Sequence, residues 1–168
     1  ILLFREYRDK QGQILERLER LYRATNGARA LVETLRRRAD YASSGGDEDP
    51  GLLRQLLFEA ATVEMHRLQD YGAAIATLKH LLELVPHDVL ALRALGEACE
   101  KQQRWGELAE ALERELTALG TREPARSLQA RYRLGVVLDA YLSLPEDALA
   151  QFQAILEAQP DHKETRQY

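Results

Sequence analysis

The chain has 168 residues, 45% of them hydrophobic and 30% charged, which excludes a wholly disordered chain and allows one compact domain or one short repeat array. No apolar run approaches the roughly 18 residues of a membrane span, so membrane insertion is not expected. One cysteine cannot form an internal disulfide, and we therefore expect a reducing, cytoplasmic location.

The net charge of -4 is unevenly distributed along the chain. Residues 1–41 carry a net charge of +4, and the remainder carries -8. A basic end and an acidic body can steer a charged partner. The alternative is a solvated helical surface with an uneven distribution of charge.

Apolar residues recur at three- and four-residue steps almost throughout, and alternation with a period of two is absent. This pattern, together with abundant Leu, Ala, Glu and Arg, predicts an all-α protein without a sheet. The predicted helices span residues 3–25, 28–42, 51–68, 71–85, 88–102, 105–118, 123–142 and 145–158.

The residues between these helices are typical of turns and helix ends. Asn26-Gly27 predicts a turn, because both residues tolerate positive φ. Residues 43–51 predict a mobile, protease-sensitive loop of small and acidic residues. The first helix is open to a break near Gln11-Gly12. Residues 160–165 resemble the start of a ninth helix, so we expect one helical domain over 1–168, cut from a longer array.

The segments pair, and the pairs resemble one another. Two first helices contain Leu95-Gly96 and Leu134-Gly135. Gly96 lets the partner helix come close, and Trp105 is predicted to begin a second helix. Ala148-x3-Phe152 followed by Pro160 completes a pattern that resembles the tetratricopeptide repeat. Aligned on Leu31, Ala74, Leu108 and Ala148, the second helices are 43, 34 and 40 residues apart, and only one spacing equals the repeat length of that family.

The resemblance implies an α-α superhelix of about four helix-turn-helix repeats that binds a peptide or a helix of a partner protein in a concave groove lined by the first helices. Residues about a third of a turn away from the buried stripe are expected to line it. These are Arg20, Arg23, Leu56, Glu59, Val63, His66, Arg93, Glu97, Glu100, Tyr132, Val136 and Asp139.

Other functions are weighed against this scaffold or adaptor role. A structural spacer, or a segment that self-associates through its terminal repeats, remains the alternative. Capture of a chaperone tail is disfavoured, because Glu16, Glu59, Val63 and Glu97 stand where basic or amide side chains would be needed.

No chemistry beyond binding is expected. The four histidines lack the spacing of metal ligands, and Cys99 is interpreted as a small buried residue rather than a nucleophile. Residues 36–38, three consecutive arginines, suit the last turn of a helix better than a nucleic-acid site, since no aromatic residues are interleaved with them. We therefore predict no enzyme activity, no cofactor, no metal and no nucleic-acid partner.

Overall fold

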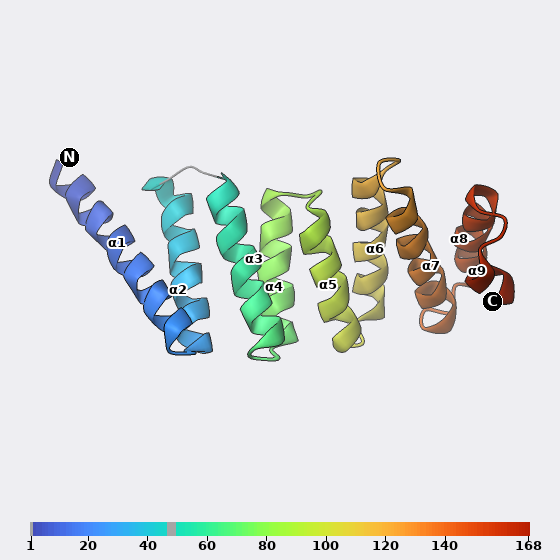
Figure 1. Ribbon diagram of the computed structural model, residues 1–168, viewed down its shortest axis with the longest axis horizontal. Helices are drawn as coiled ribbons and strands as arrows, with labels where there is room; N and C mark the ends of the chain where they lie inside the picture. Colours follow the sequence, from blue (N-terminus) through green and yellow to red (C-terminus); the bar gives the residue numbers. More distant parts are fainter. Residues whose placement is uncertain (1, 47–49) are drawn as a thin grey trace. The chain divides into compact units, whose positions relative to one another are not determined.

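The computed structural model describes residues 2–46 and 50–168, and the side chains of residues 10–44 and 51–168. Within these residues the chain forms nine α-helices, one π-helical turn and no strand (Figure 1). The α-helices are α1 (Leu2–Ala24), α2 (Ala28–Tyr41), α3 (Pro50–His66), α4 (Tyr71–Leu84), α5 (Val89–Lys101), α6 (Trp105–Leu119), α7 (Pro124–Ala140), α8 (Pro145–Ala158) and α9 (Lys163–Gln167). The predicted all-α class and the eight predicted helices are confirmed.

Three local predictions have different outcomes. Helix α1 runs through Gln11-Gly12 without a break. The predicted loop begins as the π-helical turn η1 (Ala42–Gly46), which continues α2, and residues 47–49 lie outside the described part of the chain. The predicted start of a ninth helix is confirmed by α9, where the His162 side chain accepts the Thr165 amide as an N-cap.

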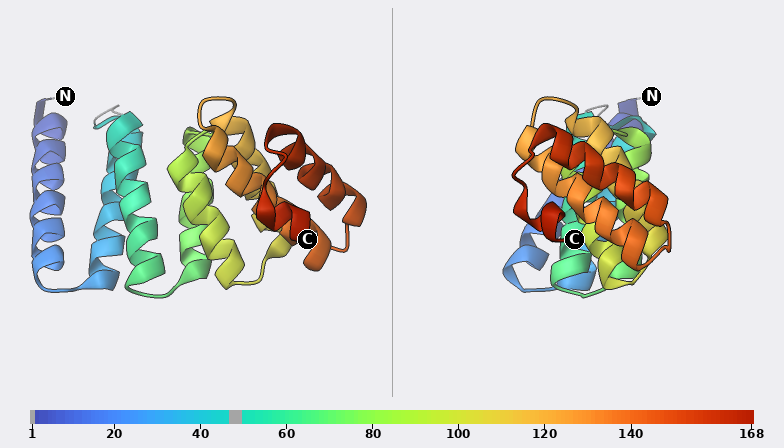
Figure 2. Two further views of the ribbon diagram at one scale, coloured as in Figure 1. Left: turned by 45° about the vertical axis from the view of Figure 1, so that its right-hand side comes forward. Right: turned by 90° about the vertical axis from the view of Figure 1, so that its right-hand side faces the viewer.

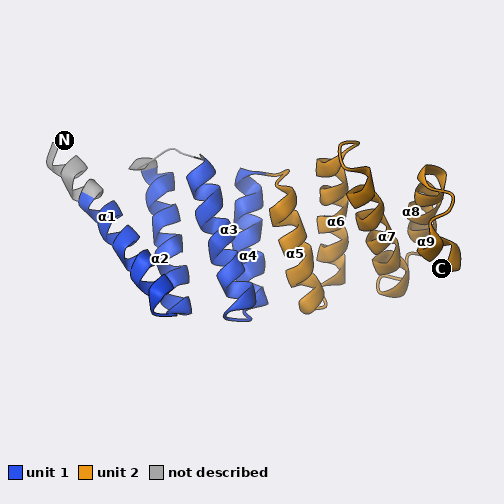
Figure 3. Ribbon diagram, viewed as in Figure 1, with its two compact units in different colours: residues 1–85 blue, residues 86–168 orange. Residues whose placement is uncertain are grey.

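Contacts divide the chain into two compact units, residues 1–85 and 86–168 (Figure 3). Unit 1 contains the pairs α1–α2 and α3–α4, and unit 2 contains α5–α6 and α7–α8 with α9. Within each unit the second helix of the first pair packs on the first helix of the next, α2 on α3 and α6 on α7. Figure 2 shows the two helices of each pair lying antiparallel. The pairing predicted from the sequence is therefore the pairing observed.

The four hairpins share one turn geometry. A residue with positive φ lies two positions before each second helix: Asn26, Gln69, Gln103 and Ser143, with φ between 55° and 58°. Only Asn26 belongs to a residue type that favours this conformation. The backbone repeat is therefore more regular than the sequence repeat, since two glutamines and a serine adopt the same turn.

Glycine allows close helix contact in both pairs of unit 2. A Cβ added to Gly96 would lie 3.3 Å from Leu108 Cδ1, and one added to Gly135 would lie 2.6 Å from Phe152 Cε1. The predicted role of Gly96 is confirmed. Trp105 begins α6 as predicted, and its ring stacks on Tyr141 with centroids 3.8 Å apart.

A buried carboxylate links three helices of unit 1. The Glu64 side chain on α3 is 1% exposed and lies 2.6 Å from Arg36 Nη2 on α2. The Thr77 hydroxyl on α4 donates to Glu64 Oε2 at 2.9 Å. Burial raises the pKa of Glu64, while the Thr77 hydrogen bond and the charge of Arg36 act in the opposite direction. The folded protein therefore holds this proton more tightly than the unfolded chain does.

Replacing Glu64 with glutamine should remove a pH dependence of stability. Because the folded pKa is raised above the unfolded value, ionisation of Glu64 costs stability as the pH rises from the unfolded pKa through the folded one. Relative to wild type, Glu64→Gln should gain stability as the pH rises above the ordinary glutamate pKa of about 4.3, measured as the urea midpoint. The control Glu33→Gln removes an exposed pair with Arg37. A pH-independent difference between Glu64→Gln and wild type would contradict the expectation.

Candidate functional site

The first helices of unit 2 expose a charged surface, which we call the unit 2 face. It consists of Arg93, Glu97 and Glu100 on α5 and Gln129 and Arg133 on α7. Glu97 and Gln129 are exposed, and the side chains of Arg93 and Glu100 are each 49% exposed. Arg133 pairs with Glu100, so an ion pair joins the two helices. Three residues predicted to line a binding surface therefore lie on this face.

A small cavity opens into the unit 2 face between α5, α6 and α7. Its volume is about 80 Å³. Its lining consists of Arg93, Leu112, Glu115, Arg126, Gln129, Ala130 and Arg133. The lining thus contains three guanidinium groups and one carboxylate.

The single carboxylate of this cavity is poorly compensated. The Glu115 side chain is 8% exposed, and its nearest ion-pair contact is Arg93 Nε at 3.6 Å. Burial raises the pKa of Glu115, and the charges of Arg93, Arg133 and Arg126 lower it to a smaller extent. Arg126 and Arg133 pair instead with Glu123 and Glu100, whose side chains are 44% and 49% exposed. Both of these pairs are accessible to solvent.

Two other predicted lining residues of α7, Tyr132 and Asp139, contact the C-terminal segment. The Tyr168 hydroxyl donates to Asp139 Oδ2 at 2.6 Å. The Tyr132 ring lies 5.8 Å from the His162 ring and 6.0 Å from the Phe152 ring. Tyr132 and Asp139 therefore already have partners within unit 2. Val136, which lies between these two residues in the sequence, is half-buried.

In unit 1 two of the predicted lining residues, Arg23 and Glu59, pair with each other. Arg23 on α1 donates to Glu59 on α3 through Nε and Nη2, at distances of 2.6 to 3.0 Å. Arg23 also lies 2.6 Å from Glu19. Arg20 and His66 are exposed. The structure thus brings Arg23 and Glu59 together as a link between helices.

Leu56 and Val63 were expected to line the surface and instead belong to the core of the protein. They are 3% and 7% exposed. Helix α3 packs against both α2 and α4, so a wide arc of its circumference is covered. Glu97, at the position on α5 that corresponds to Val63, remains exposed. The hydrophobic effect favours burial of the apolar side chain at this offset and hydration of the charged one.

Sequence reasoning did not single out three residues of the unit 2 cavity, Glu115, Arg126 and Arg133. The two arginines are seven residues apart and share one side of α7 with Gln129. That spacing was available in the sequence. The contribution of Glu115 could not be read from the sequence. Glu115 lies on α6, and only the packing of α6 against its neighbours brings it to the cavity.

The described residues contain neither a metal-binding group of side chains nor a membrane-spanning helix. No group of three His, Cys, Asp or Glu side chains lies close enough to hold a metal ion. No described helix combines the length and the apolar character needed to cross a membrane. Cys99 is buried, as predicted.

Comparison with known proteins identifies the fold. No family model matches the chain, and no curated protein matches it. Among solved structures, MamA from Desulfovibrio magneticus RS-1 is similar with a TM-score of 0.57 and 19% identity, covering 92% of this chain and 78% of that one. A Podosopora anserina kinesin light chain protein with TPR-like repeats has a TM-score of 0.60 and 15% identity, covering 90% and 76%.

A third similar structure is YrrB, described as a TPR protein with an unusual peptide-binding site. Its TM-score is 0.53 and its identity 21%, covering 93% of this chain and 73% of that one. At these identities the similarity establishes the fold. The chain has the tetratricopeptide-like, all-α superhelical repeat fold that the sequence resemblance implied.

Proposed function

We propose that this chain, whose helix pairs have the tetratricopeptide-like fold, is an interaction module that holds a peptide or helix of a partner protein on the unit 2 face. The observation that carries the proposal is the cavity between α5, α6 and α7, which opens on a face of exposed charged side chains. A similar structure, YrrB, is described as having a peptide-binding site, which supports this class of function. We propose no catalytic role, and a cytoplasmic location stays a prediction.

The chemistry of the cavity favours a segment with an acidic side chain. Arg93, Arg126 and Arg133 outnumber Glu115 within the lining. The exposed pairs Arg126–Glu123 and Arg133–Glu100 are each worth at most about 1 kcal/mol. A carboxylate of the partner can therefore replace Glu100 or Glu123 as the ion-pair partner of an arginine at a small cost in free energy. It gains a partly buried contact with guanidinium groups.

Charge reversal at the cavity should weaken peptide binding. Peptides selected from a random displayed library against the full chain are measured by fluorescence anisotropy. We expect the selected peptides to contain Asp or Glu, and expect Arg93→Glu or Arg133→Glu to reduce their affinity about tenfold, the loss of one charge-assisted contact. Arg122→Glu makes the same change at an exposed residue that does not line the cavity.

The readout has two decisive outcomes. Selective loss with Arg93→Glu and Arg133→Glu, at unchanged helicity by circular dichroism, supports the unit 2 face. Equal binding by these variants and by Arg122→Glu rejects it. Self-association through the terminal repeats stays a prediction from the sequence, and light scattering on the same samples measures it.

A further inference from the structure

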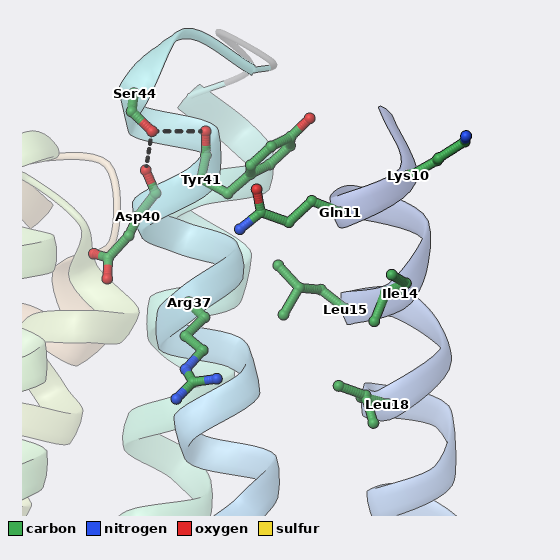
Figure 4. A pocket seen from close by; sticks show the side chains of 9 residues that line it. All are labelled: Lys10, Gln11, Ile14, Leu15, Leu18, Arg37, Asp40, Tyr41 and Ser44. Carbon is green, nitrogen blue, oxygen red and sulfur yellow. Dashed lines mark hydrogen bonds between the residues drawn. The ribbon is translucent and has the colours of Figure 1, made fainter. Parts of the chain in front are cut away.

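The cavities of the two units differ in the charges that line them. The cavity of unit 1, about 860 Å³ between α1 and α2, is lined by the apolar side chains of Leu15 and Leu18 (Figure 4). Arg37, which also lines it, already pairs with Glu33. The cavity of unit 2 instead contains the Glu115 carboxylate, whose nearest ion-pair contact is 3.6 Å long. A buried and weakly compensated carboxylate responds to protons as well as to a binding partner.

Both helices that pack against α6 in unit 2 direct arginines at Glu115. Arg93 faces it from α5, and Arg126 and Arg133 face it from α7. The described lining of this cavity contains no second acidic side chain and no histidine. An arginine in a protein keeps its charge at all ordinary pH values. Glu115 is therefore the group of this cavity that can gain or lose a proton.

The cavity is small enough to bring a carboxylate of the partner close to Glu115. Its volume is about 80 Å³, well below the roughly 300 Å³ of small-molecule pockets, so it admits the end of one side chain. If that carboxylate replaces Glu100 or Glu123 as the partner of an arginine, the number of arginines stays the same. The number of carboxylates inside the cavity rises from one to two. At such short range each negative charge disfavours the ionised form of the other.

We infer that binding of an acidic side chain in the unit 2 cavity is coupled to the uptake of a proton from solvent, which Glu115 and the carboxylate of the partner share. The inference rests on the function proposed above and adds a pH dependence to it. Two carboxylates that share a proton titrate as a pair, and the protonated one donates a hydrogen bond to the other. Burial already raises the pKa of Glu115 in the free protein, and the partner acts in the same direction.

The coupling fixes the direction of the pH effect. Because the partner raises the pKa of Glu115 further, the complex keeps a proton that the free chain has released. Affinity is therefore greatest where Glu115 is protonated in both forms. It weakens as the pH rises from the pKa of the free chain to that of the complex, and then becomes constant. We expect the dissociation constant to rise about tenfold over this range, which corresponds to one pKa unit.

Titration calorimetry on the full chain measures the proton directly. The probe is the tightest histidine-free acidic peptide among those selected from the displayed library. It is titrated from about pH 5, where its own carboxylates are already ionised, to about pH 8, in buffers with different enthalpies of ionisation. We expect wild type to take up about half a proton per peptide at the pH where affinity changes most, the value for a shift of one pKa unit.

A pair of glutamine variants assigns the proton. Glu115→Gln should abolish the uptake and, at about pH 8, bind the peptide about tenfold more tightly than wild type, because the second negative charge is gone. Glu113→Gln makes the same change at an exposed residue of α6 outside the cavity and should behave as wild type. Uptake that persists in Glu115→Gln, or that disappears instead in Glu100→Gln or Glu123→Gln, would overturn the inference. Weaker binding by Glu115→Gln would also overturn it.

The same data separate this inference from the proposed function. Binding that Arg93→Glu weakens, but that takes up no proton and does not change with pH, would reject the coupling and leave the function of the unit 2 face intact. Binding that neither Arg93→Glu nor Arg133→Glu weakens would reject both, because the peptide would then lie outside the cavity.

Discussion

Gly135→Val is expected to lower the free energy of unfolding by about 1–3 kcal/mol, the usual cost of overpacking a core. A Cβ at residue 135 would lie 2.6 Å from Phe152 Cε1 and 2.8 Å from Cζ. The Phe152 ring cannot easily retreat, since it is 8% exposed and has the Tyr132 and Tyr168 rings at 6.0 and 4.7 Å. Either α7 and α8 separate or the aromatic cluster rearranges. Urea unfolding followed by circular dichroism measures the loss.

Gly106→Val is the matched control. No atom lies within 4 Å of a Cβ built on Gly106, which is also in a helix. Valine is at least as favourable as glycine in a helix, so this variant should change stability by no more than about 0.5 kcal/mol. In the Gly135→Val background, Phe152→Leu should recover part of the loss by making room. Equal effects at residues 106 and 135 would show that close packing of α7 on α8 is unimportant.

Val63→Asp is expected to cost about 3 kcal/mol or more. Val63 is 7% exposed, so the change removes buried apolar surface and buries a carboxylate without a partner. Thr62→Asp is the matched control, because Thr62 is the adjacent residue of α3 and is exposed. It should change stability by no more than about 0.5 kcal/mol. A small effect of Val63→Asp in urea unfolding would mean that Val63 is accessible, as the sequence interpretation assumed.

The Val63 result also bears on how binding is tested. A substitution that unfolds unit 1 removes every binding surface of that unit, so loss of binding by Val63→Asp would not show that Val63 contacts the partner. Arg93 and Arg133 are better choices, because their side chains are 49% and 38% exposed and can change without a cost in core packing. The buried positions should be reserved for measurements of stability.

The helices could be predicted closely because their signals are local. Trp105 begins α6 and Pro145 begins α8 where the sequence predicted. The glycine at residue 96 predicted a close helix contact, and Leu108 provides it. Such signals depend on neighbours along the chain and survive in any tertiary context. The π-helical turn η1 has no comparable local signal, since its serines and glycines are equally typical of a loop.

The binding surface was predicted less well, because exposure depends on neighbours that are distant in sequence. Helical geometry placed Val63 and Glu97 at equivalent offsets, but packing covers the first and leaves the second in solvent. The pairing of Arg133 with Glu100 joins residues 33 positions apart. Helical periodicity relates residues that are three or four positions apart, so it could not predict this pair.

The sequence by itself determined that the chain is all-α, that its helices pair, and that Gly96 allows one pair to pack closely, because periodicity and turn chemistry act within a few residues. Tertiary structure alone decided that Glu115 shares a cavity with three arginines, and that Glu19 of α1 pairs with Arg38 of α2. Those arrangements follow from the packing of side chains on different helices, and the free energy of a buried charge depends on which partners packing brings to it.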